Sequence, residues 1–236
     1  MRLLTRSDFD GLACGTILKK LGIIDCWTFV HPKDIQAGII EVTKDDVLAN
    51  VPYVEGCGLW FDHHSSEAER LGTDLVYEGA SYPEDSAARV IYEYYGGKNK
   101  HPQFETMVQA VDKVDSAKLT KENILLPTGW VLLGFVMDRT ELGRFRDFRI
   151  SNYELMEKLI DACATKNIEQ ILSDPDVEER VKLYFEQNLL FREMISSYTR
   201  TDEATYTPTP MDELIQTPKH EYKLLILLCT LLSYKR

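Results

Sequence analysis

The chain has 236 residues, 44% of them hydrophobic, and a formal net charge of −11. This length and composition allow one sizeable domain with an appendage, or two small domains. The excess of acidic residues argues against general binding of duplex DNA, which relies on Lys and Arg to neutralise phosphates. A small anionic substrate is still allowed, because bound divalent cations would reverse the local field.

The five cysteines are an odd number and include no Cys-x-x-Cys pair. We therefore expect reduced thiols and a cytoplasmic protein rather than a disulfide framework. The longest apolar run, residues 224–232, is too short to cross a bilayer. No membrane partner is expected.

Strand and helix signals alternate in the first part of the chain. A short buried strand is predicted over residues 1–5, and a helix over 12–21 follows the turn Ser7-Asp8-Phe9-Asp10-Gly11. Further strands are predicted at 26–30, 46–51 and 58–61. This alternation predicts an α/β fold over residues 1–125, a mostly parallel sheet with helices on both faces.

Helical periodicity dominates the rest of the chain. It covers residues 86–95 and 104–114, and it resumes from 152 to about 197 with an interruption at Asp174-Pro175. Ser173 or Asp174 is the expected cap of the helix that starts at Pro175. We expect residues 126–197 to be a helical extension that completes the domain or leads to a linker. We expect residues 198–236 to be a linker and an atypical, truncated tail.

Asp8 and Asp10 lie where the first predicted strand ends. In open α/β sheets, active sites collect at the carboxyl ends of the strands. Carboxylates at this spacing can each bind a metal ion. Alternatively, Asp8 is the nucleophile and Asp10 the acid/base of a dehalogenase-type phosphatase. A third interpretation is an aspartate that only caps the helix.

Asp62, His63 and His64 follow the apolar run 58–61. Paired imidazoles suit manganese, zinc or iron. Consecutive side chains at a strand end diverge, so one imidazole can bind metal while the other donates to a phosphate. This pair favours metal binding over the dehalogenase alternative, which has no use for it.

Asp112 and Asp115 lie three residues apart, on one face at the end of an apolar helix. Either carboxylate could reach the sheet edge as a distal metal ligand. The residues alone leave both open. The non-functional interpretation is a solvated helix end.

These elements, in this order, resemble the DHH phosphoesterase superfamily. The resemblance covers roughly residues 1–195. Similarity to the exopolyphosphatase-related branch rests on four segments: His-Pro-Lys-Asp (31–34), Asn-Val-Pro-Tyr (50–53), Gly-Leu-Trp-Phe-Asp-His-His (58–64) and Gly-Arg-Phe-Arg-Asp-Phe-Arg (143–149). Relatives include manganese pyrophosphatases, single-strand exonucleases, oligoribonucleases and cyclic-dinucleotide phosphodiesterases.

The resemblance implies a site for two divalent cations, usually Mn2+, with Mg2+ as the alternative. Asp8 would hold one ion, while Asp10 and His63 would hold the other, completed by Asp112. In such sites two ions about 4 Å apart activate a water and stabilise the leaving oxygen. His64 would contact the scissile phosphate. The implied metal ligands are Asp8, Asp10, Asn50, Asp62, His63 and Asp112.

Three features depart from the family pattern. Many relatives have a metal-binding His before the first aspartate, where this chain has Arg6. A guanidinium stays protonated and cannot ligate, so we expect Arg6 to bind a substrate phosphate instead. The third strand ends at Asn50 rather than at a bridging aspartate, which leaves the first metal site loose or empty. Nothing in the sequence resembles the DHH-associated C-terminal domain.

The sequence thus predicts a divalent-metal-dependent phosphoesterase that hydrolyses phosphoanhydride or phosphodiester bonds, with His64 and Arg6 as catalytic and substrate-binding residues. The expected partner is a small phosphorylated substrate, such as polyphosphate or a nucleotide, or a short single-stranded nucleic acid. A homodimer is left open. The alternative, motivated by Arg6 and Asn50, is a catalytically degenerate DHH-fold module that binds nucleotide or phosphate.

Overall fold

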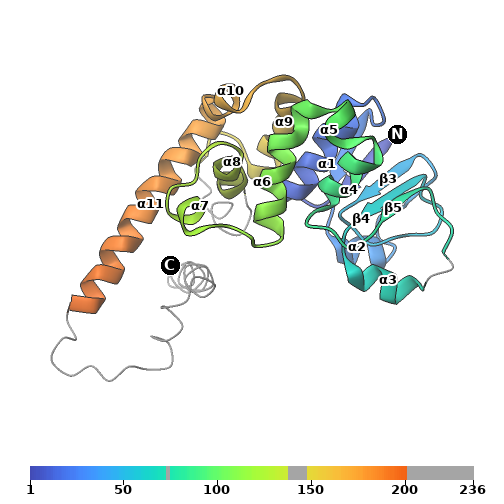
Figure 1. Ribbon diagram of the computed structural model, residues 1–236, viewed down its shortest axis with the longest axis horizontal. Helices are drawn as coiled ribbons and strands as arrows, with labels where there is room; N and C mark the ends of the chain where they lie inside the picture. Colours follow the sequence, from blue (N-terminus) through green and yellow to red (C-terminus); the bar gives the residue numbers. More distant parts are fainter. Residues whose placement is uncertain (73–74, 138–147, 201–236) are drawn as a thin grey trace.

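The computed structural model describes residues 1–72, 75–137 and 148–200 (Figure 1). A fully parallel five-stranded sheet, in the order β2-β1-β3-β4-β5, lies in the N-terminal part. This confirms the predicted α/β fold. The strands are β1 (Arg2–Thr5), β2 (Cys26–Phe29), β3 (Asp46–Ala49), β4 (Leu59–Asp62) and β5 (Gly79–Ser81).

Helices flank this sheet and, with the loops that join them, form the rest of the described chain. The sequence predicted α1, α4 and α6 within a few residues, but it did not predict the short helices α2, α3 and α7 or strand β5. The helices are α1 (Phe9–Lys20), α2 (Pro32–Gln36), α3 (Ser65–Leu71), α4 (Ala87–Tyr94), α5 (Gly97–Lys100), the 3-10 turn η1 (Pro102–Phe104), α6 (Glu105–Asp115), α7 (Lys121–Leu125), α8 (Gly129–Met137), α9 (Asn152–Thr165), α10 (Ile168–Leu172) and α11 (Pro175–Arg200).

A hydrophobic core packs against each face of the sheet. Successive strand residues point to opposite sides, so neighbouring residues contribute to different cores. On one face Leu3 and Phe61 join the large core formed with α1, α4, α6 and α9. On the other face Leu4 and Trp60 pack with Ile35 of α2 in a smaller core. Figure 1 shows α2 and α3 on the side of the sheet away from α1. Burial on both faces explains why the strands are continuous apolar runs.

The second half of the described chain is a helical layer built around α8. Residues 131–137 of α8 are all buried, between α6, α9, α10 and α11 (Figure 1). A helix that is apolar all round belongs in a core, which is why it shows no amphipathic period. The long predicted helix from 152 is interrupted twice. One break is at Asn167, which caps α10, and the other is near Asp174.

Two sequence-based expectations concern thiols and membranes. None of the helices within the described ranges is both long and apolar enough to cross a membrane. The cysteines in this part of the chain are free thiols: Cys14, Cys26, Cys57 and Cys163. The predicted linker and tail after residue 200 lie outside the described residues, as does the similarity at 143–147.

Candidate active site

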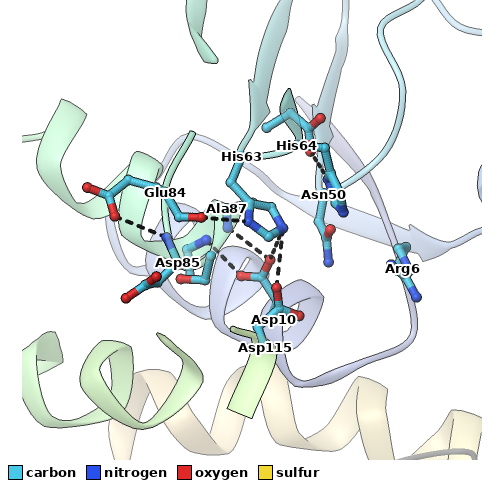
Figure 2. Close-up of polar contacts among 12 residues, drawn as sticks. Arg6, Asp10, Asn50, His63, His64, Glu84, Asp85, Ala87 and Asp115 are labelled. Carbon is cyan, nitrogen blue, oxygen red and sulfur yellow. Dashed lines mark hydrogen bonds and ion pairs between the residues drawn. The ribbon is translucent and has the colours of Figure 1, made fainter. Parts of the chain in front are cut away.

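Three turns meet at the carboxyl edge of the sheet. Strands β1, β3 and β4 are neighbours, with Thr5 beside Ala49 and Ala49 beside Phe61. The residues that follow these strands therefore lie close together (Figure 2). They are Arg6 to Asp10 after β1, Asn50 after β3, and His63 and His64 after β4.

Asp10, His63 and Asp115 form what we call the carboxylate–imidazole cluster. One ligand atom from each lies within 4.8 Å of the other two. His63 Nε2 is 3.3 Å from Asp115 Oδ2 and 3.8 Å from Asp10 Oδ2. Figure 2 shows the His63 ring directed at both carboxylates.

The orientation of His63 identifies which ring nitrogen faces the cluster with a lone pair. Its Nδ1 lies 3.1 Å from the carbonyl oxygen of Glu84, which can only accept a hydrogen bond. Nδ1 therefore carries the hydrogen of the neutral ring. Nε2 is buried, on a side chain 10% exposed, and has no hydrogen-bond partner. When Nδ1 alone carries hydrogen, the lone pair of Nε2 faces two carboxylates, an arrangement that a cation between the three groups would stabilise.

Asp10 is held rigidly at the centre of this cluster. Its carboxylate accepts hydrogen bonds from the backbone N–H groups of Ala87 (2.9 Å) and Ala88 (2.8 Å), in the first turn of α4. Burial raises the pKa of Asp10 well above its usual value, and the negative charges of Asp115 and Asp8 add to the effect. Burial also raises the pKa of Asp115, although His63 partly offsets this. The main cause of both shifts is burial, and neighbouring carboxylates raise both pKa values further.

This donor set fits a divalent cation. Two carboxylates and one imidazole suit manganese, zinc or iron. Three protein ligands leave coordination positions for water or substrate, as catalytic metal sites require. Metal-binding histidines usually donate their other N–H to a carbonyl or carboxylate, and the Glu84 carbonyl does this for His63.

Asp8 lies in a contrasting environment, which we call the Arg6–Asp8–Asn50 group. Asp8 Oδ1 accepts from the backbone N–H of Gly11 (2.8 Å), so this residue caps α1. Asn50 Nδ2 donates to the same oxygen at 3.1 Å. Arg6 Nε lies 3.0 Å from Asp8 Oδ2. Asp8 thus combines the predicted helix cap with an ion pair.

The two turns that carry this group are sterically demanding. Asn50 has a left-handed backbone, with φ of 55°, which Asn tolerates better than most residues. Its side chain is buried, and its Oδ1 has no hydrogen-bond partner. At Gly11 a Cβ would lie 2.0 Å from the carbonyl oxygen of Arg6. Only glycine lets the chain pass between β1 and α1 in this way.

Asp62 orients His64 and is not part of the carboxylate–imidazole cluster. Its buried Oδ1 lies 2.9 Å from His64 Nδ1. The hydrogen bond with Asp62 raises the pKa of His64 against the opposing effect of burial. The side chain of His64 is 42% exposed, so a positively charged imidazole can meet an anionic ligand at the edge of the site.

Asp112, the distal ligand preferred from the sequence, is not in the cluster; its alternative, Asp115, is. Asp112 accepts from Ser86 Oγ at 2.7 Å and pairs with Arg89 at 2.6 Å. Asp115 is the last residue of α6, and it faces His63 instead. Two acids three apart share a helix face but differ by a turn in height, and the sequence could not say which height matches the sheet edge.

Three contributors were missed because they are backbone atoms. They are the carbonyl of Glu84 and the N–H groups of Ala87 and Ala88. The available signal was Ser86, a helix-capping residue at the start of an apolar helix. Such a helix start presents free N–H groups to an anion, here the Asp10 carboxylate.

Comparison with known proteins identifies a solved structure of similar fold. Neither models of protein families nor the curated proteins match it. Among solved structures it is similar to a pGpG-specific phosphodiesterase, PggH from Vibrio cholerae. The identity is 47% and the TM-score 0.72, over 83% of this chain and 63% of the other. The chain therefore shares its fold and close to half of the aligned residues with a phosphodiesterase, of whose length it spans less than two thirds.

Proposed function

We propose that this chain is a divalent-metal-dependent phosphoesterase that hydrolyses phosphodiester bonds in short nucleotide substrates. The observation that carries the proposal is that buried His63 Nε2, which has no hydrogen-bond partner, lies beside the carboxylates of Asp10 and Asp115. Similarity at 47% identity to a phosphodiesterase supports the reaction class. We assign Mn2+ as the cofactor, with Mg2+ as the alternative, because carboxylate ligands suit both ions and the phosphoesterases that the sequence resembles usually use Mn2+.

The residues divide the work by charge. Asp10, His63 and Asp115 would hold the cation. A divalent cation bound there would supply a Lewis acid for the phosphoryl oxygen and would lower the pKa of a water, so that hydroxide becomes available to attack phosphorus. His64 and Arg6, both partly exposed, would bind the substrate phosphate through charge-assisted hydrogen bonds.

His64 is prepared for this task by Asp62. The carboxylate raises the pKa of His64, which favours the imidazolium form that donates to an anion. Asp62 also fixes the ring through Nδ1, so Nε2 is the nitrogen that can donate to the substrate. Asp62 would therefore act on His64 rather than on the cation.

The substrate class follows from charge and similarity. A net charge of −11 disfavours long duplexes, whereas a short nucleotide needs only the local positive charge of the site. The similar phosphodiesterase is described as specific for pGpG, a linear dinucleotide. We therefore rank linear dinucleotides above polyphosphate and longer single strands.

The second candidate is a degenerate module that binds phosphate or nucleotide without efficient turnover. It is favoured by the Arg6–Asp8–Asn50 group, in which a carboxylate expected to hold metal is already bound by an arginine and an amide. The two candidates differ in turnover, not in binding.

The test is hydrolysis by the purified chain with Mn2+, using pGpG, polyphosphate and short oligonucleotides as substrates. We expect pGpG to be cleaved fastest, and Asp10→Asn to lower kcat/KM by more than about 100-fold, since even the outer partners of metal ligands cost up to about that much. Asp45→Asn is the matched control, because Asp45 is exposed and precedes β3 at the opposite end from Asn50. Equal turnover by wild type and Asp10→Asn would rule out the proposal, and tight binding without turnover would favour the degenerate module.

A further inference from the structure

We infer that this active site holds a single divalent cation, and that the guanidinium of Arg6 takes the place of a second one. The inference rests on the proposed function and deepens it. It concerns the two halves of one edge of the sheet, which are the carboxylate–imidazole cluster (Figure 2) and the Arg6–Asp8–Asn50 group.

The first step is the occupancy of the Asp8 carboxylate. Oδ1 accepts from Gly11 N (2.8 Å) and Asn50 Nδ2 (3.1 Å), and Oδ2 lies 3.0 Å from Arg6 Nε. Two hydrogen bonds occupy Oδ1, and one of them comes from a backbone N–H fixed by the start of α1. A metal ion bound to Asp8 would therefore have to reach Oδ2, where the guanidinium of Arg6 already lies.

The second step is the charge of each half. Asp10 and Asp115 bring two carboxylates, and His63 is the basic side chain in contact with both. Asp8 is already neutralised by Arg6, whose guanidinium is always protonated. A second divalent cation there would face a fixed positive charge with one carboxylate to compensate it. The carboxylate–imidazole cluster has one carboxylate more than the Arg6–Asp8–Asn50 group, which in turn contains a guanidinium. The cluster should therefore attract a cation more strongly.

The third step is the chemistry of Asn50. Its amino group points at Asp8 as a donor, and a donor cannot ligate a cation. Its remaining acceptor, Oδ1, is buried without a hydrogen-bond partner and carries no formal charge. A carboxylate at this position would instead repel Asp8 and attract a cation. The amide therefore favours the Arg6–Asp8 ion pair over a metal ion.

The consequence for substrate binding is a division between one metal and one arginine. Arg6 contacts Asp8 through Nε, so its terminal nitrogens can donate to a phosphate while the ion pair persists. The positive charge that two-metal sites obtain from a second ion would come here from Arg6, with His64 beside it. Such a site binds substrate with charge that chelators cannot remove.

The test is the metal stoichiometry of the full chain. Purified protein is stripped with a chelator, titrated with MnCl2 by calorimetry, and examined at saturation by electron paramagnetic resonance. We expect one tight equivalent and the spectrum of an isolated Mn2+ ion. Arg6→Lys, which keeps the charge, should also bind one equivalent. Arg6→His combined with Asn50→Asp replaces a cation and an amide with two ligands, and it should bind a second equivalent.

Two tight equivalents in the wild-type chain, or the spectrum of a coupled manganese pair, would overturn the inference. With turnover intact, that result would leave the proposed function standing. Absence of any binding together with absence of turnover would overturn both. The wild-type stoichiometry decides the matter even if the double variant fails to fold, which circular dichroism would reveal.

Discussion

Asp8 and Asp10 lie two residues apart in one turn, yet their surroundings are opposite. Asp8 is bound by a guanidinium, an amide and a backbone N–H. Asp10 is buried beside a second carboxylate and an imidazole lone pair, and its pKa is raised by that burial. Their neighbours, contributed by other strands and helices, decide which aspartate can hold a cation.

The contrast arises from where each side chain points at the start of α1. Asp8 is the N-cap, at the mouth of the site, where its side chain is 25% exposed and meets Arg6 and Asn50. Asp10 is inside the first turn and points to the N-terminus of α4. The same short motif thus contributes both a helix cap and a residue of the candidate metal site.

The largest expected difference in Mn2+ affinity is between a variant of the carboxylate–imidazole cluster and a variant of the Arg6–Asp8–Asn50 group. His63→Gln removes the imidazole ligand, and we expect Mn2+ affinity to fall by more than about 100-fold. Asn50→Gly keeps the left-handed backbone and leaves the cluster intact, so the affinity should fall by less than about tenfold. Calorimetric titration measures both. Similar losses in the two variants would mean that the two halves form one binding site.

A smaller effect should follow from loosening the support of Asp10. Arg89 and Ser86 both bind Asp112, and this network fixes the first turn of α4 that donates to Asp10. We expect Arg89→Ala to weaken Mn2+ binding by about 10-fold to 100-fold. Arg89→Lys should recover part of it.

The control for this variant is Arg70→Ala, which removes another arginine paired with an acid, Glu67, on helix α3. If Arg89→Ala and Arg70→Ala bind Mn2+ equally well, Asp112 and Arg89 have no positioning role.

The smallest effect concerns an ion pair that serves the fold alone. Asp46, at the other end of β3 from Asn50, is bound by Arg2 at 2.6 Å. Burial raises the pKa of Asp46, but hydrogen bonds from Arg2 and Thr43 outweigh it and lower the pKa overall. A lowered pKa means that the charged form stabilises the fold above the unfolded pKa, near 3.9, and that this stability is lost as the pH falls through the folded value.

We therefore expect Asp46→Asn to reduce the free energy of unfolding by about 1 kcal/mol at pH 7, because Arg2 is partly exposed. The difference from wild type should shrink as the pH approaches 3, with Mn2+ affinity at pH 7 unchanged. Urea unfolding at several pH values measures this. A difference that grows on acidification would contradict the assigned role of the pair.

The sheet could be predicted from the sequence because its strands are short apolar runs with polar residues at their carboxyl ends. Strand β5 (Gly79–Ser81) could not be predicted, because Gly-Ala-Ser lacks the branched and aromatic residues that are typical of a strand. α8 showed no amphipathic period, since it is buried on all sides. An amphipathic pattern needs one buried and one exposed face, so it cannot reveal an element that is buried on all sides.

For the site, the sequence placed Asp8, Asp10, His63 and His64 at one edge, because they directly follow parallel strands. It could not choose between Asp112 and Asp115, which depends on how α6 is set against the sheet. It also noted Arg6 and Asn50 as departures, but their shared contact with Asp8 required the fold.

The most direct test is anomalous diffraction at the manganese edge from crystals of the full chain grown with MnCl2. We expect one strong peak among the side chains of Asp10, His63 and Asp115, with Arg6 still paired to Asp8. A second peak of similar height beside Asp8, with Arg6 displaced, would contradict the single-cation site. No peak at the carboxylate–imidazole cluster would contradict the metal-dependent mechanism itself.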